Sequence, residues 1–221
     1  MPKPRVYIET TIPSFYHDPR PDPAIVEMRH WTRLWWDAAV DKYDLVTSSY
    51  VRDELASGIG EFAAHRLALL HGVRLIAQPP QLAETVQVYL RNKLMPAVPP
   101  LDAVHLALAS LDRCDFIVTW NCKHLANPNK AAHIQRINRS LGLHVPRVVT
   151  PRDGQEGRMS ERLSAAEAAI EEIREVRRRI SERFGHDPVR LCAHGRESHA
   201  ELVRQGWPEA PPRSDLPGPE A

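Results

Sequence analysis

Apolar residues follow two kinds of pattern along this chain, and the two kinds alternate. Between five short apolar runs, apolar residues recur with the helical period, as they do in residues 25–40. Strands that alternate with helices predict an α/β fold with a parallel sheet covered by helices on both faces. The runs rich in β-branched residues, which are typical of buried strands, are residues 5–9, 44–48, 73–77, 115–120 and 147–150.

The character of the sequence changes after Thr150. Residues 151–158 form a polar linker that contains glycine, and residues 159–206 predict a helical extension whose first helix is long and charged. The last segment, 207–221, is so rich in proline that we expect it to be disordered. The sequence therefore predicts one α/β domain over residues 1–150, followed by helices. The apolar stripe of the long helix consists of Leu163, Ile170, Ile173, Val176 (or Arg177) and Ile180.

Composition narrows the class of protein. The hydrophobic content of 43% is that of a globular chain, and no run approaches the roughly 18 apolar residues needed to cross a membrane. The amino terminus enters a strand directly and lacks the apolar core of a signal peptide, and three scattered cysteines make a poor disulfide framework. We therefore expect a cytoplasmic protein. The net charge of +1 is not the strong basic footprint of many nucleic-acid-binding proteins.

Polar residues stand where several of the expected strands end. Glu9 follows the first strand, Glu54 lies on the helix after the second, Asp102 opens a later helix, and Asn121 follows the fourth strand. Ligands of parallel sheets bind beyond the carboxyl ends of the strands, so these side chains are expected to converge on one pocket. Three carboxylates in a cleft repel one another unless a cation neutralises them, and oxygen ligands suit Mg²⁺ or Mn²⁺.

Four motifs in order give this chain a family resemblance. YIETTIPSF, SSYVRDEL, DAVHLALA and TWNCKHLAN together resemble the PIN-domain ribonucleases, especially the VapC-like toxins of type II toxin–antitoxin systems, over about residues 4–150. The resemblance implies a three-layer α/β/α domain, often dimeric, that hydrolyses RNA phosphodiester bonds with Mg²⁺ or Mn²⁺. It also implies that Glu9, Glu54 and Asp102 bind the metal and that Asn121 completes the catalytic set. Glutamate at position 9 and asparagine at position 121 depart from the aspartates usual there. The longer carboxylate of Glu9 can still bind metal, whereas Asn121 offers one neutral oxygen and predicts a weaker second half of the metal site.

The helical extension has a resemblance of its own. The run IEEIREVRRRISERFGHDP resembles the short helical antitoxins that accompany such toxins. This implies that the helix docks in a groove of the nuclease domain, where Arg177, Arg178 or Arg179 could reach the acidic pocket, although a separate antitoxin could also serve. The alternative interpretation is an ordinary amphipathic extension packed on its own or a neighbouring domain.

Other interpretations stay open for the site. Each acid taken singly is compatible with a surface position, and Asn121 is compatible with a catalytically degenerate PIN domain that binds RNA or a protein without cutting. Near the site, Lys123 and His124 could meet the RNA backbone. His105 is interpreted as a packed helix histidine and Asp53 as a solvated residue.

Overall fold

A five-stranded parallel sheet forms the centre of the protein. The computed structural model describes residues 2–58, 62–153 and 163–213. The strand order is β3-β2-β1-β4-β5, and every neighbouring pair is parallel. Each run predicted as a strand contains one, although the strands are shorter than the runs. The strands are β1 (Arg5–Ile8), β2 (Asp44–Thr47), β3 (Arg74–Leu75), β4 (Phe116–Val118) and β5 (Arg147–Val149).

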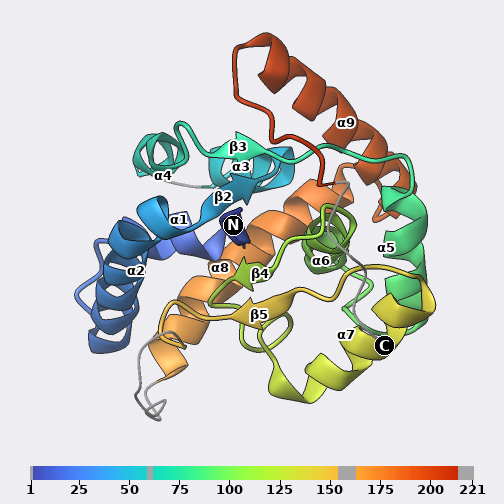
Figure 1. Ribbon diagram of the computed structural model, residues 1–221. Coiled ribbons are helices and arrows are strands. Elements are labelled where there is room, and N and C mark those ends of the chain that lie inside the picture. Colours follow the sequence, from blue (N-terminus) through green and yellow to red (C-terminus); the bar gives the residue numbers. More distant parts are fainter. Residues whose placement is uncertain (1, 59–61, 154–162, 214–221) are drawn as a thin grey trace.

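Helices cover both faces of the sheet, which confirms the predicted three-layer α/β/α architecture. In Figure 1, α1 and α2 lie on one side of the strands, and α5, α6 and α7 lie on the other. Within the described part of the chain, no helix is both long and apolar enough to cross a membrane. The helices are α1 (Thr11–Tyr16), α2 (Pro23–Lys42), α3 (Ser49–Ala56), α4 (Ala63–Leu69), α5 (Leu82–Arg91), α6 (Leu101–Leu111), α7 (Pro128–Ser140), α8 (Leu163–Glu182) and α9 (Pro188–Arg204).

Three of the longer helices begin with the same local signal. Asp22, Asn127 and Asp187 precede α2, α7 and α9, and the side chain of each accepts a hydrogen bond from the backbone N–H two residues later. A proline follows each cap, in the first helical position, where it has no N–H to lose and its φ is already helical. The boundaries of these helices are therefore encoded locally.

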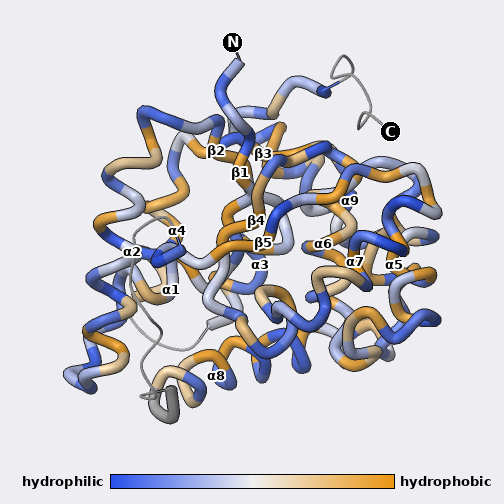
Figure 2. Tube along the Cα trace, turned by 60° about the horizontal axis from the view of Figure 1, so that its bottom comes forward, coloured by the Kyte–Doolittle hydropathy of each residue, from blue (hydrophilic) through white to orange (hydrophobic). Residues whose placement is uncertain are grey.

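The helix α8 crosses the carboxyl ends of the strands. Figure 2 shows it at the end of the molecule opposite to the first described residues, which lead into β1. It packs against α2 and α3, and its buried apolar residues include Ile170, Val176 and Ile180, which belong to the predicted stripe. Residues 154–162, which hold most of the predicted linker and the first residues of the predicted extension, lie outside the described residues, as does the side chain of Leu163.

The helix α9 packs against α3 and α5 at a notch made by Gly195. A Cβ atom at position 195 would overlap the hydroxyl and ring of Tyr50 on α3, so only glycine lets the two helices approach this closely. Ser49 strengthens the contact, because its hydroxyl donates a hydrogen bond of 3.1 Å to the Gly195 carbonyl oxygen. The fit between α3 and α9 thus depends on one glycine.

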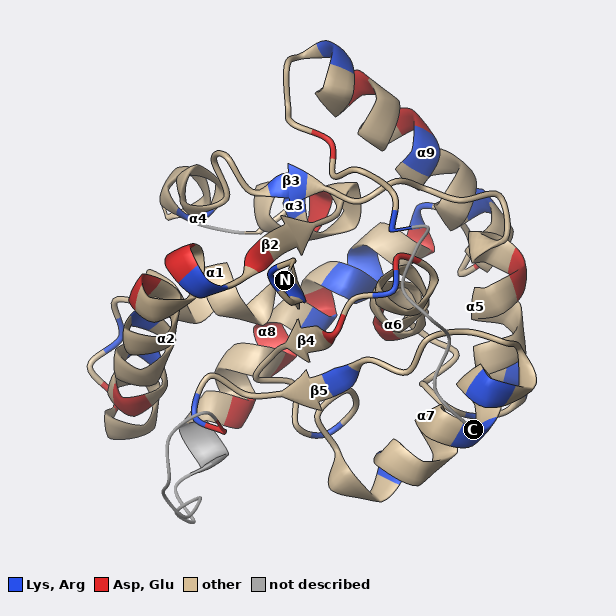
Figure 3. Cartoon of the chain, in the orientation of Figure 1, with Lys and Arg blue, Asp and Glu red and all other residues tan. Residues whose placement is uncertain are grey.

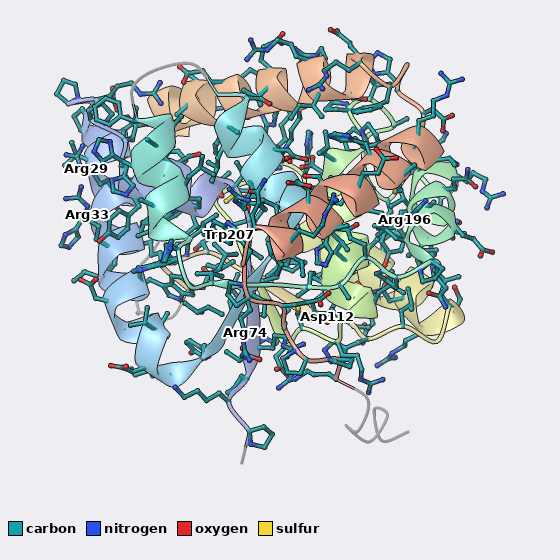
Figure 4. The ribbon with its side chains drawn as sticks, turned by 90° about the horizontal axis from the view of Figure 1, so that it is seen from above. Arg29, Arg33, Arg74, Asp112, Arg196 and Trp207 are labelled. Carbon is teal, nitrogen blue, oxygen red and sulfur yellow. The ribbon has the colours of Figure 1, made fainter. Side chains whose placement is uncertain are left out.

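A strap of residues 207–213 follows α9 and corrects the prediction of disorder for 207–221. Its backbone pairs with the edge strand β3: the Leu75 N–H donates to the Pro208 carbonyl at 2.8 Å, and the Ala210 N–H donates to the Leu75 carbonyl at 2.8 Å. Trp207, which is labelled in Figure 4, lies 3.9 Å from the Arg52 guanidinium in a cation–π contact. Backbone pairing to an open sheet edge does not depend on hydropathy, so composition could not reveal it. Residues 214–221 lie outside the described part of the chain.

Candidate active site

The four residues predicted for the site meet at the carboxyl edge of the sheet. Glu9 follows β1, Glu54 lies on α3, Asp102 lies in the first turn of α6 and Asn121 follows β4. All four are at most 4% exposed. Glu9, Glu54 and Asp102 are called the acidic cluster below. The parallel sheet brings them together because its strand ends share one edge.

Hydroxyl groups hold one side of the Glu9 carboxylate. Its Oε2 accepts hydrogen bonds from the Thr11 backbone N–H at 2.9 Å, the Thr11 hydroxyl at 2.6 Å and the Thr119 hydroxyl at 2.8 Å. The other oxygen, Oε1, accepts from Arg177. The two threonines therefore fix the carboxylate and leave one oxygen directed at the centre of the cluster.

A buried relay orients Glu54. Its Oε1 accepts from His105 Nε2 at 2.7 Å, and the other ring nitrogen of His105 lies 2.8 Å from the Tyr7 hydroxyl. That hydroxyl in turn lies 2.7 Å from the Ser48 hydroxyl. Burial favours the neutral form of Glu54, but Arg177 and His105 outweigh it and the pKa of Glu54 is lowered. Glu54 is thus ionised at neutral pH and fixed by a chain of three side chains.

Asp102 connects Asn121 and His124. Its Oδ1 accepts from Asn121 Nδ2 at 3.0 Å, and its Oδ2 lies 2.7 Å from His124 Nδ1. Burial alone would raise the pKa of Asp102, but Arg177 and His124 prevail and lower it to about 2. Asn121 uses its amide nitrogen on Asp102, and its oxygen accepts from Arg174 of α8 at 3.0 Å. In this arrangement Asn121 acts as a bridge between an acid and the extension.

Arg177 of α8 contacts every member of the acidic cluster. Its Nε donates to Glu54 at 2.8 Å, its Nη1 donates to Asp102 at 2.6 Å, and its Nη2 donates to Glu9. The side chain is 1% exposed, and the three carboxylates raise the pKa of Arg177 against the opposing effect of burial. Of the three arginines that the sequence left open, Arg177 reaches the pocket. Arg178 is 39% exposed, and its ion pairs are with Glu171 and Glu175 of its own helix.

The acidic cluster has the composition of a cation site. One guanidinium faces three buried carboxylates, so the cluster keeps an excess of negative charge that a divalent ion would neutralise better. One ligand atom from each of Glu9, Glu54 and His105 lies within 4.8 Å of the others, and Asp102 binds the same guanidinium. The residues therefore fit a hard divalent ion with mostly oxygen ligands. Arg177 and such an ion would compete for the same oxygens.

Two residues near the site differ from their sequence interpretation. His105 packs in the core, as expected, but it also holds Glu54, a role that the spacing of three residues from Asp102 did not indicate. Asp53 points away from the acidic cluster, as predicted, yet it is not solvated. It accepts a hydrogen bond of 3.0 Å from Ser198 of α9, and burial raises its pKa. Asp53 differs from the prediction because α9 covers it, and the local sequence does not encode this long-range contact.

The lowered pKa of Asp102 predicts how stability depends on pH in metal-free buffer. The folded chain holds the pKa of Asp102 at about 2, against an ordinary 3.8, so the stabilisation is present above about pH 4 and is lost as the pH falls through 2. A shift of this size corresponds to about 2 kcal/mol. Urea unfolding of the wild type and of Asp102→Asn between pH 2 and 6 should show a stability gap that narrows by about this amount at the acid end. A gap independent of pH would contradict it.

Comparison with known proteins gives no relative for this chain. Protein-family models, curated proteins and solved structures were each compared with it, and none matches. Function is therefore inferred from the geometry of the site and from the motifs in the sequence.

Proposed function

We propose that the α/β domain is a PIN-type endoribonuclease that hydrolyses RNA phosphodiester bonds with Mg²⁺ or Mn²⁺, and that the helical extension restrains it as an antitoxin restrains a toxin. The observation that carries the proposal is the convergence of three buried carboxylates from separate chain segments on one guanidinium. Few structural roles require three buried acids at a strand edge, whereas metal-dependent phosphodiester hydrolysis does.

In this proposal each residue has a defined task. Glu9, Glu54 and Asp102 would hold the divalent ion, which supplies a water of lowered pKa and neutralises charge on the phosphate. Thr11 and Thr119 keep the Glu9 carboxylate in place. His105 keeps Glu54 in place through its hydrogen bond to Tyr7. Asn121 orients Asp102 from the neighbouring strand end and offers a neutral oxygen toward the substrate when Arg174 withdraws.

Restraint by the extension follows from the position of α8. Its Arg177 occupies the centre of the acidic cluster, and its Arg174 takes the oxygen of Asn121. While these two arginines occupy the ligand oxygens, neither a metal ion nor a phosphate can bind them. The tether keeps the helix at a high local concentration, so the intact chain is expected to be inactive.

The second candidate is a degenerate domain that binds RNA or a protein without cutting. It is favoured by Asn121, which replaces an expected acid and leaves the fourth position uncharged. Metal titration separates the candidates, because the nuclease should bind Mn²⁺ in a manner that depends on Asp102, and the binding module should not.

The test of the proposed function is RNA cleavage by chains in which the restraint is removed. Two such chains are Arg177→Met and a chain that ends at Asp153, each assayed with Mg²⁺ or Mn²⁺ on a structured RNA. Each is compared with the same chain carrying Asp102→Asn, after circular dichroism has shown that both are folded. We expect cleavage that falls by at least about a hundredfold with Asp102→Asn, because a metal ligand is lost. Equal rates in the paired proteins would refute the nuclease assignment.

A further inference from the structure

A cavity of about 470 Å³ lies beside the acidic cluster, between α1, α3, α4 and α8. Glu54 of the cluster and Thr10 both line it, and both are 2% exposed. Phe15 and Leu55 give it an apolar floor. Its volume is within the range of small-molecule sites, and it remains open although α8 forms one of its walls. The cavity thus reaches the acidic cluster at Glu54, with α8 as one of its walls.

Arg20 enters this cavity from a rigid support. Asp18, which is 3% exposed, accepts hydrogen bonds from Arg20 Nε at 2.9 Å and from Nη2 at 2.5 Å. The Arg20 backbone N–H also donates to Asp18, at 3.1 Å. This clamp leaves Nη1 for another anion, and Nη1 donates to Glu172 of α8 at 2.7 Å. A guanidinium has five N–H donors, so it can bind one carboxylate with two nitrogens and still donate to a second anion.

Arg66 of α4 lines the same cavity. Among the described residues it forms no ion pair, and its buried Nε has no hydrogen-bond partner. Burial lowers the pKa of Arg66, and the nearby Asp18 offsets this only in part. A buried N–H of a guanidinium that has no partner is costly, and a bound anion would satisfy it.

The charges of α8 complement both the arginines of the cavity and the acidic cluster. Glu172 lies at Arg20, and Arg177, five residues later, lies at the acidic cluster. The two positions are about 7.5 Å apart along the helix axis. Figure 3 shows acidic and basic residues side by side along α8. The helix therefore presents a carboxylate to the cations of the cavity and a guanidinium to the anions of the cluster.

We infer that Arg20 and Arg66 form a phosphate-binding subsite for the RNA backbone beside the acidic cluster, and that Glu172 takes the place of this phosphate in the restrained chain. The inference rests on the proposed function, since it assigns the neighbouring phosphate of the same substrate. In it, α8 mimics two absent groups at once: Arg177 stands for the metal ion, and the Glu172 carboxylate stands for a phosphate.

The test measures RNA binding by a full-length chain that cannot cleave RNA. The background is Asp102→Asn with Arg177→Met, and the probe is a short fluorescein-labelled single-stranded RNA followed by anisotropy over a series of KCl concentrations. Arg66→Gln is expected to weaken binding about tenfold and to reduce the slope of log affinity against log salt by about 0.7, the value for one phosphate contact. Arg20→Gln should act in the same direction and serves as the second variant, each checked for folding by thermal melting.

Matched controls separate this subsite from general electrostatics. Arg139→Gln removes an exposed arginine on α7 and should leave affinity and slope unchanged. Glu172→Gln should raise RNA affinity roughly threefold by freeing Arg20, whereas Glu182→Gln, exposed at the end of α8, should not.

The outcomes distinguish this inference from the proposed function. If Arg66→Gln and Arg20→Gln bind RNA as tightly as the background does, the subsite is refuted even where cleavage is observed. If they weaken binding but Arg177→Met and the chain that ends at Asp153, both with Asp102 intact, do not cleave RNA, the subsite stands and the nuclease assignment fails. A further experiment measures the binding of inorganic phosphate. If Arg66→Gln weakens phosphate binding but not RNA binding, the assignment to an RNA backbone is overturned.

Discussion

Replacing Arg177 by methionine is expected to destabilise the metal-free protein by roughly 3–5 kcal/mol. Methionine keeps much of the volume of the arginine stem, but it leaves three carboxylates, none more than 5% exposed, with no cation between them. Removing one partner of a buried ionic network costs more than the network contributes, because the remaining charges stay desolvated. Urea unfolding at neutral pH in the presence of EDTA measures the loss.

A divalent ion should reverse this loss. In Arg177→Met the acidic cluster is free to bind Mn²⁺, and each tenfold rise in its concentration above the dissociation constant should add about 1.4 kcal/mol. In the wild type, Arg177 competes for the same oxygens, so the same titration should have little effect. The matched control is Arg178→Met, on the neighbouring but exposed residue, where the expected loss is below about 1 kcal/mol. Equal stability of the two variants, or no gain with Mn²⁺, would contradict the cation role of Arg177.

The sheet and the meeting of the acids could be predicted because both depend on local patterns and one topological rule. β-branched runs identify strands, and parallel strands bring their carboxyl ends to one edge, so Glu9 and Asn121 were expected at the same edge of the sheet. Glu54 and Asp102 followed because each lies within two turns of the start of its helix. This part of the site depends little on side-chain packing.

The parts that could not be predicted depend on helix phase and on long-range contacts. Arg177 lies close to Val176 on the apolar stripe, and only the docked helix decides which of three consecutive arginines faces the acids. The sequence around His105 is that of an ordinary buried helix histidine. Its role depends on hydrogen bonds to Tyr7 and Glu54, which are distant along the chain. The backbone pairing of the strap with β3 cannot be predicted from a proline-rich sequence, because it requires no particular side chains. In each case the partner is distant along the chain.

Cutting the chain within residues 154–158 is expected to leave two pieces that stay associated at micromolar concentration and separate on dilution. The extension is held by α8 on α2 and α3, by α9 on α3 and α5, and by the strap on β3. These contacts do not require the peptide link, but the link supplies an effective concentration that the cut removes. A protease site placed in this segment, followed by size-exclusion chromatography over a dilution series, measures the association.

Substitution of Gly195 tests directly whether the contact between α3 and α9 holds the extension in place. Gly195→Leu forces a side chain against Tyr50 and should weaken the association of the cut pieces by at least about tenfold, as overpacking of a close contact does. Arg204→Ala, on a 73% exposed residue of the same helix, should leave it unchanged. RNA cleavage should begin at the protein concentration where the pieces dissociate. This concentration should be higher for Gly195→Leu than for the control. Pieces that separate at once after cutting, or cleavage that does not follow dissociation, would show that the extension does not restrain the site by docking.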